Sequence, residues 1–181
     1  MKLEEKTLSS ETIYSGKVIT VQLDKAELPN GDTALREVVK HPGGVTIAAL
    51  TDNNELLFVR QFRYPFKEIV LELPAGKLEK GSAPLENAKR ELLEETGAVG
   101  YNYISLGSQM ASPGFCTEVV HMYLCRVEHF ENPEPDEDEF LSIEKIPIDK
   151  AVEMVLNNQI FDGKTQTAIL KASILLKLGK I

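Results

Sequence analysis

This chain has few cysteines and no long apolar segment. Cys116 and Cys125 are its only cysteines, and they form no Cys-x-x-Cys pair. A disulfide framework is therefore not expected, and free thiols in a reducing cytosol are the default. No apolar run approaches the roughly 20 residues that a membrane span requires. The first six residues, Met-Lys-Leu-Glu-Glu-Lys, are charged and lack the apolar core of a signal peptide, so we expect a cytoplasmic protein.

The chain also lacks an excess of positive charge. Its 20 Lys and Arg residues are outnumbered by 28 Asp and Glu residues, which gives a net charge of −8 at pH 7. That balance argues against general binding to nucleic acids or to anionic membranes. It does not exclude an anionic substrate, because a bound metal ion can invert the local field. Carboxylates gather in residues 91–95 and 131–139, which suggests that the protein handles metal ions.

What is present fits an ordinary folded domain. A chain of 181 residues with 43% hydrophobic and 27% charged residues can bury one core. Apolar alternation and turn signals predict strands at 11–24 (two strands around a turn), 35–40, 45–50, 56–62, 70–76, 102–111, 117–128 and 140–146. Helical spacing predicts helices at 83–96, 148–158 and 164–178. This mixture predicts an α/β sandwich with a mixed sheet.

The helix at 83–96 carries the most informative residues. Ser82 is a plausible N-cap, Pro84 suits the first turn, and Gly97 suits a left-handed end of the helix. Glu91, Glu94 and Glu95 have i, i+3 and i+4 spacing, which places three carboxylates on one helix face. Their repulsion can be offset by a cation, and hard oxygen donors suit Mg²⁺ or Mn²⁺. Taken alone, the cluster could also be a solvated helix face.

The frame around the cluster resembles a known motif, the Nudix box, Gly-x5-Glu-x7-Arg-Glu-U-x-Glu-Glu-x-Gly-U, where U is aliphatic. The matching residues are Gly76, Arg90, Glu91, Leu92, Glu94, Glu95 and Gly97. The motif's first glutamate is replaced by Ser82, and its last aliphatic residue by the small Ala98. Because a serine can cap a helix but cannot neutralise a cation, we expect Ser82 to lower stability or activity without abolishing it. Glu86, one turn later, is a candidate replacement.

The resemblance implies a Nudix-type α/β/α sandwich with a mixed sheet. Proteins of this family use divalent cations to cleave nucleoside diphosphates that are linked to another group. The implied ligands of Mg²⁺, or of Mn²⁺ as a substitute, are Glu91 and Glu95, a shared and catalytic Glu94, and the main-chain carbonyl of Ala75. Arg90 would orient these carboxylates. Alternatively, Arg90 is a surface residue that pairs with Glu86 four positions earlier.

A second motif narrows the resemblance to one branch of the family. Pro113 lies fifteen residues after Ala98, and Ser112-Pro113-Gly114 is followed by Glu118. This spacing resembles the loop of the ADP-ribose pyrophosphatase branch and implies hydrolysis of ADP-ribose to AMP and ribose 5-phosphate. A plain Pro-Gly turn between strands is the simpler alternative.

In that branch the general base is a glutamate on a late acidic loop. Here the candidates are Glu137 and Glu139, and we favour Glu137 because Glu139 adjoins the strand that follows. Such a residue would move in when metal and substrate bind. A merely solvated acidic loop is the alternative interpretation.

Further residues are candidates for substrate binding. A guanidinium suits bidentate phosphate recognition, so Arg63 is the favoured diphosphate contact. Arg60 is a further candidate, which strand alternation places on the opposite face from Arg63. By resemblance, Arg36 and Glu37 contact the nucleotide, and Tyr14 stacks on adenine. The loop of Ser112 and Pro113 is a further substrate contact. Glu118 would bind a metal ion indirectly or a ribose hydroxyl. Tyr14 is equally well interpreted as a core or surface aromatic.

The expected organisation is an amino-terminal strand region at 1–42 and a Nudix hydrolase domain at 43–181, with the box at 76–98. By resemblance the strand region forms a homodimer, and no nucleic-acid or membrane partner is expected. Two alternatives stay open for the function. One is a Nudix pyrophosphatase for another nucleoside diphosphate derivative, such as a nucleotide sugar or a dinucleoside polyphosphate. The other is a non-catalytic domain that senses ADP-ribose.

Overall fold

The chain folds into two compact units, each with its own sheet. The computed structural model describes residues 2–135 and 139–181. One unit comprises Met1–Gly43 and Met110–Val119, and the other comprises Gly44–Gln109 and Val120–Ile181. Glu137, one of the two candidate bases, lies outside the described residues, whereas Glu139 lies within them.

The first unit is an antiparallel sheet of three strands, β1 (Lys6–Ser15), β2 (Thr20–Glu27) and β3 (Thr33–Lys40). Asn30 and Gly31 lie in the turn between β2 and β3, where Gly31 has a φ of 90°. Among the described residues of this unit, Ala26 is the only buried apolar side chain. Larger apolar side chains are exposed, namely Leu3, Leu8, Ile13, Tyr14, Val18, Leu35, Met110 and Phe115. This sheet therefore has almost no core of its own.

The second unit is built on a mixed sheet of seven strands. They are β4 (Gly44–Leu50), β5 (Glu55–Arg63), β6 (Glu68–Glu72), β7 (Ala75–Lys77), β8 (Ala98–Met110), β9 (Val119–Phe130) and β10 (Leu141–Pro147). The main order is β10-β5-β4-β9-β8, with β6 paired to β5 and β7 paired to β4. The central strands β4 and β9 run parallel, whereas β10 and β6 both pair antiparallel with β5.

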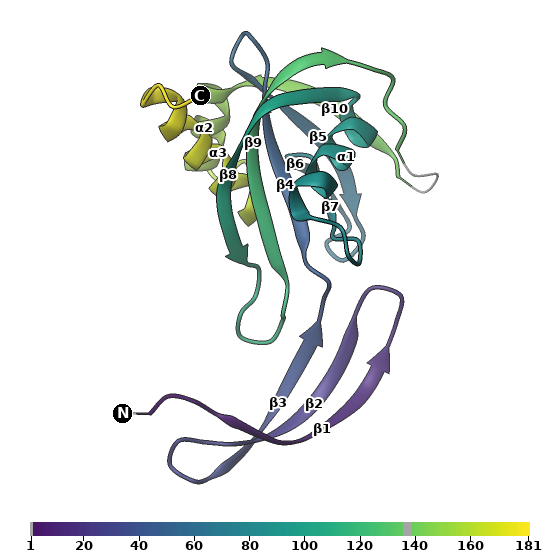
Figure 1. Cartoon of the computed structure of the whole chain (residues 1–181), viewed down its shortest axis with the longest axis vertical. Coiled ribbons are helices and arrows are strands. Elements are labelled where there is room, and N and C mark those ends of the chain that lie inside the picture. The colour runs from purple at the N-terminus through teal and green to yellow at the C-terminus, as the bar shows by residue number, and fades with distance from the viewer. Residues whose placement is uncertain (1, 136–138) are drawn as a thin grey trace. The chain divides into compact units, whose positions relative to one another are not determined.

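Helices cover both faces of this second sheet (Figure 1). The helices are α1 (Pro84–Thr96), α2 (Ile148–Leu156) and α3 (Gly163–Lys177). Side chains of β4 alternate between two cores, because successive residues of a strand point to opposite faces. Ala48 and Leu50 join the core beneath α2 and α3, whereas Ile47 and Ala49 join the core beneath α1. The predicted α/β/α sandwich with a mixed sheet is confirmed.

The predicted elements are largely confirmed, with shifts at their ends. The strand predicted at 102–111 begins at Ala98, directly after α1, and the segment predicted as one strand at 70–76 divides into β6 and β7. Leu73 and Pro74 separate the two strands, and β7 begins at a functional candidate, Ala75. Within 2–135 and 139–181, no helix combines the length and the apolar character needed to cross a bilayer.

Candidate active site

Helix α1 begins and ends through backbone geometry. The residue at its amino-terminal boundary is Ala83, with no side-chain hydrogen bond, so the prediction of Ser82 as N-cap is wrong. The Ser82 N–H instead donates to the Glu79 carbonyl at 3.2 Å, in a turn that precedes the helix. Pro84 occupies the first turn and Gly97 ends the helix with a φ of 70°, as predicted.

A buried asparagine connects the preceding loop to α1. The side-chain oxygen of Asn87 accepts from the Glu79 N–H at 3.1 Å, and its amide nitrogen donates to the Ala83 carbonyl at 3.0 Å. Asn87 is 1% exposed, and its side chain makes both bonds in partly buried surroundings. Glu86 faces solvent and pairs with Lys89 at 2.9 Å. The loop is therefore fastened by Asn87, and the structure does not support Glu86 as the replacement for the missing glutamate.

The three glutamates of α1 differ in burial. Glu91 and Glu95 are buried, whereas Glu94 is partly exposed. Glu95 accepts a hydrogen bond from the Ala75 N–H at 3.0 Å, which joins the helix to the first residue of β7. A Cβ at Gly76 would collide with the Glu91 carboxylate. The glycine of the motif thus lets the backbone of β7 pass directly against a buried carboxylate.

Arg90 lies among these carboxylates. Its guanidinium forms ion pairs with both Glu91 and Glu94, and it lies 3.5 Å from Glu79. The prediction that Arg90 orients the carboxylates agrees with this geometry. The alternative pairing with Glu86 is wrong, because Glu86 pairs with Lys89.

The buried carboxyls favour protonation. Burial raises the pKa of Glu95 to about 8, and the nearby charge of Glu91 adds to the rise while the Ala75 N–H opposes it. Burial also raises the pKa of Glu91, against the opposing charge of Arg90. The charge of Glu139 makes a smaller contribution to both increases, which places Glu139 within electrostatic reach of the two carboxyls. A cation would relieve these penalties.

The described residues do not form a preassembled metal cage. No group of three or more His, Cys, Asp or Glu side chains within 2–135 and 139–181 is arranged to hold a metal ion. Arg90 occupies oxygens of Glu91 and Glu94, and the Ala75 N–H occupies an oxygen of Glu95. The donor set nevertheless fits a divalent cation, because two buried carboxyls with raised pKa lie against the backbone at the start of β7.

The segment after β9 is attached to the carboxyl end of α1. The Glu131 N–H donates to the Gly97 carbonyl at 2.7 Å, and the Glu134 N–H donates to the Glu94 carbonyl at 3.0 Å. A Cβ at Gly97 would collide with the Glu131 carbonyl. A cavity of about 610 Å³ lies here, lined by Arg90, Leu93, Glu94, Phe130, Glu131, Asn132 and Glu134. The acidic segment therefore starts beside the helix that carries the candidate metal ligands.

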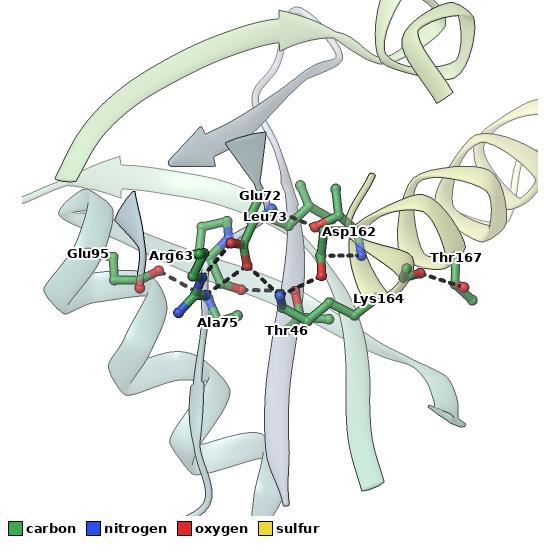
Figure 2. A network of polar contacts seen from close by, with 12 residues as sticks. Thr46, Arg63, Glu72, Leu73, Ala75, Glu95, Asp162, Lys164 and Thr167 are labelled. Carbon is green, nitrogen blue, oxygen red and sulfur yellow. Dashed lines mark hydrogen bonds and ion pairs between the residues drawn. The ribbon is translucent and has the colours of Figure 1, made fainter. Parts of the chain in front are cut away.

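Arg63 belongs to a buried ionic network (Figure 2). Its Nε and Nη2 donate to the two Glu72 oxygens at 2.6 and 2.8 Å. Lys164 also pairs with Glu72, and it lies 2.9 Å from Asp162. Burial acts to raise the pKa of Glu72, but the hydrogen bonds and charges of Arg63 and Lys164 outweigh it and hold that pKa below its ordinary value.

Sequence reasoning missed most of this network. Glu72 is a lone acid inside the apolar run Val70-Leu71-Glu72-Leu73, and Asp162-Gly163-Lys164-Thr165 carries an N-cap signal at the start of α3. The lone acid and the N-cap residue are visible in the sequence, but no sequence pattern pairs Glu72 with a lysine 92 positions later. Arg60 lies elsewhere, in an ion pair with Glu144 of β10.

The other predicted substrate residues lie in the first unit. Arg36 donates from Nη2 and Nε to the Glu5 carboxylate at 2.7 and 2.9 Å, and Glu37 is an exposed neighbour on β3. The Tyr14 ring is 57% exposed, so the interpretation as a core aromatic is wrong.

The loop of Ser112 and Pro113 is a tight turn within this unit. The Ser112 carbonyl accepts from the Cys116 N–H at 2.9 Å. The turn is connected to β3, where the Val39 N–H donates to the Phe115 carbonyl at 2.7 Å. Glu118 lies 3.6 Å from His41. These contacts place Pro113 and Glu118 beside the end of β3.

Comparisons with known proteins find relatives that match this chain over most of its length. An ADP-ribose pyrophosphatase of Bacillus subtilis is 43% identical over 92% of this chain and 91% of its own. A methanol dehydrogenase activator of Bacillus methanolicus is likewise 43% identical, over 92% and 91% of the two chains. An ADP-ribose pyrophosphatase of Mycobacterium tuberculosis is 34% identical over 87% of this chain and 77% of its own.

Structural and family comparisons lead to the same group. The crystal structure of an ADP compounds hydrolase superposes with a TM-score of 0.86 at 20% identity and covers all of both chains, so it shares the fold. The nucleoside diphosphate sugar hydrolase N-terminal domain matches residues 5–39, and the NUDIX domain matches residues 40–165. With its carboxylate helix, the close approach of Gly76 to that helix and these matches, the chain belongs to the Nudix family.

Proposed function

We propose that this protein hydrolyses ADP-ribose to AMP and ribose 5-phosphate in a reaction that depends on a divalent cation. The observation that carries the proposal is the pair of buried carboxyls, Glu91 and Glu95, facing the backbone of β7 with raised pKa. The substrate is suggested by the names of two relatives, the ADP-ribose pyrophosphatases of B. subtilis and M. tuberculosis.

The metal is Mg²⁺, with Mn²⁺ as a substitute. Glu91 and Glu95 would hold it, together with Glu94 and the carbonyl of Ala75. When bound, such an ion neutralises the diphosphate and lowers the pKa of a coordinated water molecule. Arg90 keeps Glu91 and Glu94 in position through its ion pairs.

Arg63 binds the diphosphate through its guanidinium, which is suited to bidentate phosphate recognition. The acidic loop supplies the general base that accepts the proton of the attacking water. Both Glu137 and Glu139 are retained as candidates, and Glu139 is supported by its electrostatic reach to Glu91 and Glu95. Replacement of the base by glutamine should lower kcat by roughly 10²- to 10⁴-fold. Near-full rates in both Glu137→Gln and Glu139→Gln would exclude the loop from catalysis.

The first unit supplies the nucleotide contacts. In this proposal Arg36 and Glu37 bind the nucleotide, and the exposed Tyr14 stacks on adenine. The turn of Ser112 and Pro113 and the Glu118 carboxylate bind the ribose side or a metal ion. Arg60 makes a secondary contact at most, because Glu144 already neutralises it.

The protein acts as a homodimer through residues 1–42, and residues 43–181 form the hydrolase domain. The dimer is supported by the exposed apolar side chains of the three-stranded sheet, because exposed apolar surface marks sites of protein–protein contact. We further place the protein in the cytoplasm, where Cys116 and Cys125 stay as free thiols.

A second candidate function comes from the comparison with B. methanolicus. The methanol dehydrogenase activator matches this chain at the same identity and over the same share as the pyrophosphatase of B. subtilis. Sequence similarity therefore does not decide between a pyrophosphatase and an activator of a dehydrogenase. A GDP-mannose pyrophosphatase of Yersinia enterocolitica, 32% identical over 72% of this chain, adds nucleotide sugars to the substrates that deserve testing.

One assay tests the hydrolysis of ADP-ribose against the other candidate substrates. Product release is measured from ADP-ribose, GDP-mannose, ADP-glucose, a dinucleoside polyphosphate and a nucleoside triphosphate, with Mg²⁺ or with EDTA, for the wild type and Glu95→Gln. Metal-dependent AMP formation that prefers ADP-ribose and collapses in the variant supports the proposal. Preference for another substrate would keep the hydrolase and replace the substrate. Binding of ADP-ribose without turnover would favour a sensor.

A further inference from the structure

Glu72 has more cationic partners than its single charge requires. Its side chain is 3% exposed, and both oxygens accept from the Arg63 guanidinium. That bidentate pair alone would satisfy the carboxylate. Lys164 nevertheless contacts the same carboxylate from α3 (Figure 2). A buried carboxylate with two cations can lose one of them and remain neutralised.

The two cations differ in how firmly they are held. The Lys164 side chain is 17% exposed and lies between two carboxylates, those of Glu72 and Asp162. Asp162 is fixed in turn, because its Oδ2 accepts from the Thr165 N–H at 3.0 Å at the start of α3. The Arg63 side chain is 38% exposed, at the carboxyl end of β5. Arg63 is thus the accessible cation and Lys164 the fixed one.

Arg63 also lies toward the candidate metal site. Its charge affects the pKa of Glu95, and the Glu95 charge affects the pKa of Arg63, so the two side chains are within electrostatic reach. Its Nε and Nη2 donate to Glu72, whereas no hydrogen bond from Nη1 is found among the described residues. An anion bound beside Glu95 would therefore lie within electrostatic reach of the Arg63 charge.

We propose that Lys164 is the permanent counter-ion of Glu72, and that it releases Arg63 to bind the substrate diphosphate. When Arg63 turns to the diphosphate, Lys164 neutralises Glu72, and the amino terminus of α3 stabilises Asp162. Without Lys164, the release of Arg63 would leave a buried carboxylate without a counter-ion, and substrate binding would bear that cost. Lys164 is in this sense a positioning residue that acts through Arg63. The inference rests on the proposed function, in which Arg63 contacts the diphosphate.

A purely structural role for α3 is the competing explanation. The Thr165 hydroxyl accepts from the Leu73 N–H at 3.0 Å, so α3 also fixes the segment that leads to Ala75. Removal of Lys164 could then disturb the metal site without any effect on Arg63. Thr165→Val is the matched control, because it removes this hydrogen bond and leaves all four charges of the network in place.

The test measures affinity rather than turnover. Calorimetry with Mg²⁺ gives the Kd of two non-hydrolysable probes, the α,β-methylene analogue of ADP-ribose and methylenediphosphonate, which carries the diphosphate chemistry alone. We expect Lys164→Met to weaken both by about tenfold or more, the loss typical of one charge-assisted contact, and Lys164→Arg to retain most of the affinity. Arg63→Met should weaken both probes in the wild type and add little in the Lys164→Met background.

Rescue distinguishes the charge mechanism from a structural one. In Glu72→Gln/Lys164→Met the carboxylate is gone, so Arg63 is free and affinity should return to within about threefold of Glu72→Gln alone. A structural loss would persist, since neither change restores the Lys164 bridge to Asp162. Additive effects of Arg63→Met and Lys164→Met, or no rescue, would overturn the inference. If methylenediphosphonate binds and the analogue of ADP-ribose does not, the proposed nucleotide substrate is wrong, and the methylenediphosphonate affinities still test the role of Lys164. If Arg63→Met leaves both affinities unchanged, the inference itself is wrong.

Discussion

Glu95 holds a carboxyl group in surroundings that favour its neutral form. Burial raises its pKa from an ordinary 4.5 to about 8. Because the folded state binds the proton more tightly, the stability linked to this group is fully present below pH 4.5 and is lost as pH rises through about 8. A bound cation should compensate, since it favours the ionised form.

The melting temperature of the metal-free protein should therefore fall between pH 5 and 8, and Glu95→Gln should reduce that fall. Mg²⁺ should raise the melting temperature of the wild type more at pH 8 than at pH 6, because fewer protons compete. Thermal melts in EDTA and in Mg²⁺ check both statements. Identical pH profiles for the wild type and the variant would contradict the assignment of the raised pKa to Glu95.

Gly97 is required at its position for two separate reasons. Its φ of 70° lies in the left-handed region, and a Cβ would collide with the Glu131 carbonyl. We expect Gly97→Ala to lower the free energy of unfolding by roughly 2–4 kcal/mol. Gly81→Ala is the matched control, because Gly81 has a φ of 87° with open space around it, and should cost only about 1 kcal/mol. Urea denaturation measures both, and equal losses would show that the clash is relieved.

At the scale of elements, the start of α1 depends on a side chain from inside the helix. Asn87→Ala leaves the Glu79 N–H and the Ala83 carbonyl without their partner, which should cost about 1–3 kcal/mol of unfolding free energy. Glu86→Ala, on the exposed side of the same turn, should stay within about 0.5 kcal/mol.

Urea denaturation measures the Asn87 and Glu86 variants, and a steady-state assay of turnover tests the departure at Ser82. With Asn87 already fastening the loop, Ser82→Glu should change turnover by less than about tenfold, because Ser82 is exposed and only its backbone is bonded to Glu79. A much larger gain would assign the family glutamate a part in the reaction. A neutral Asn87→Ala would show instead that the loop is held elsewhere.

The elements differ in how much their sequence reveals. Helix α1 was predictable because Pro84, Gly97 and the carboxylate spacing are local signals. The pairing of β4 and β5 was predictable from the Asn-rich turn between two apolar runs. The contacts of Asn87 and of Lys164 were not predictable, because they depend on where segments meet after folding. An asparagine in a helix has no local sign that it will be buried.

At the scale of the whole molecule, the amino-terminal sheet has the apolar surface of an interface. Leu35 is 63% exposed on β3. We expect Leu35→Lys to shift the protein from dimer to monomer while circular dichroism stays unchanged, because the side chain contributes nothing to a core. Light scattering after size-exclusion chromatography measures the mass, and a wild-type monomer would refute the dimer.

The attachment of the acidic segment to α1 has a consequence for how this region can vary. Both anchors are main-chain N–H groups, at residues 131 and 134, while the side chains of this stretch face solvent. Pro133 and Pro135 occupy positions that donate neither anchor. The side chains of residues 131–135 are thus almost free to vary, whereas the two main-chain N–H groups must be kept. Mutation can replace the side chains of residues 131–135 without loss of either anchor, but a proline at 131 or 134 would detach the segment from the helix.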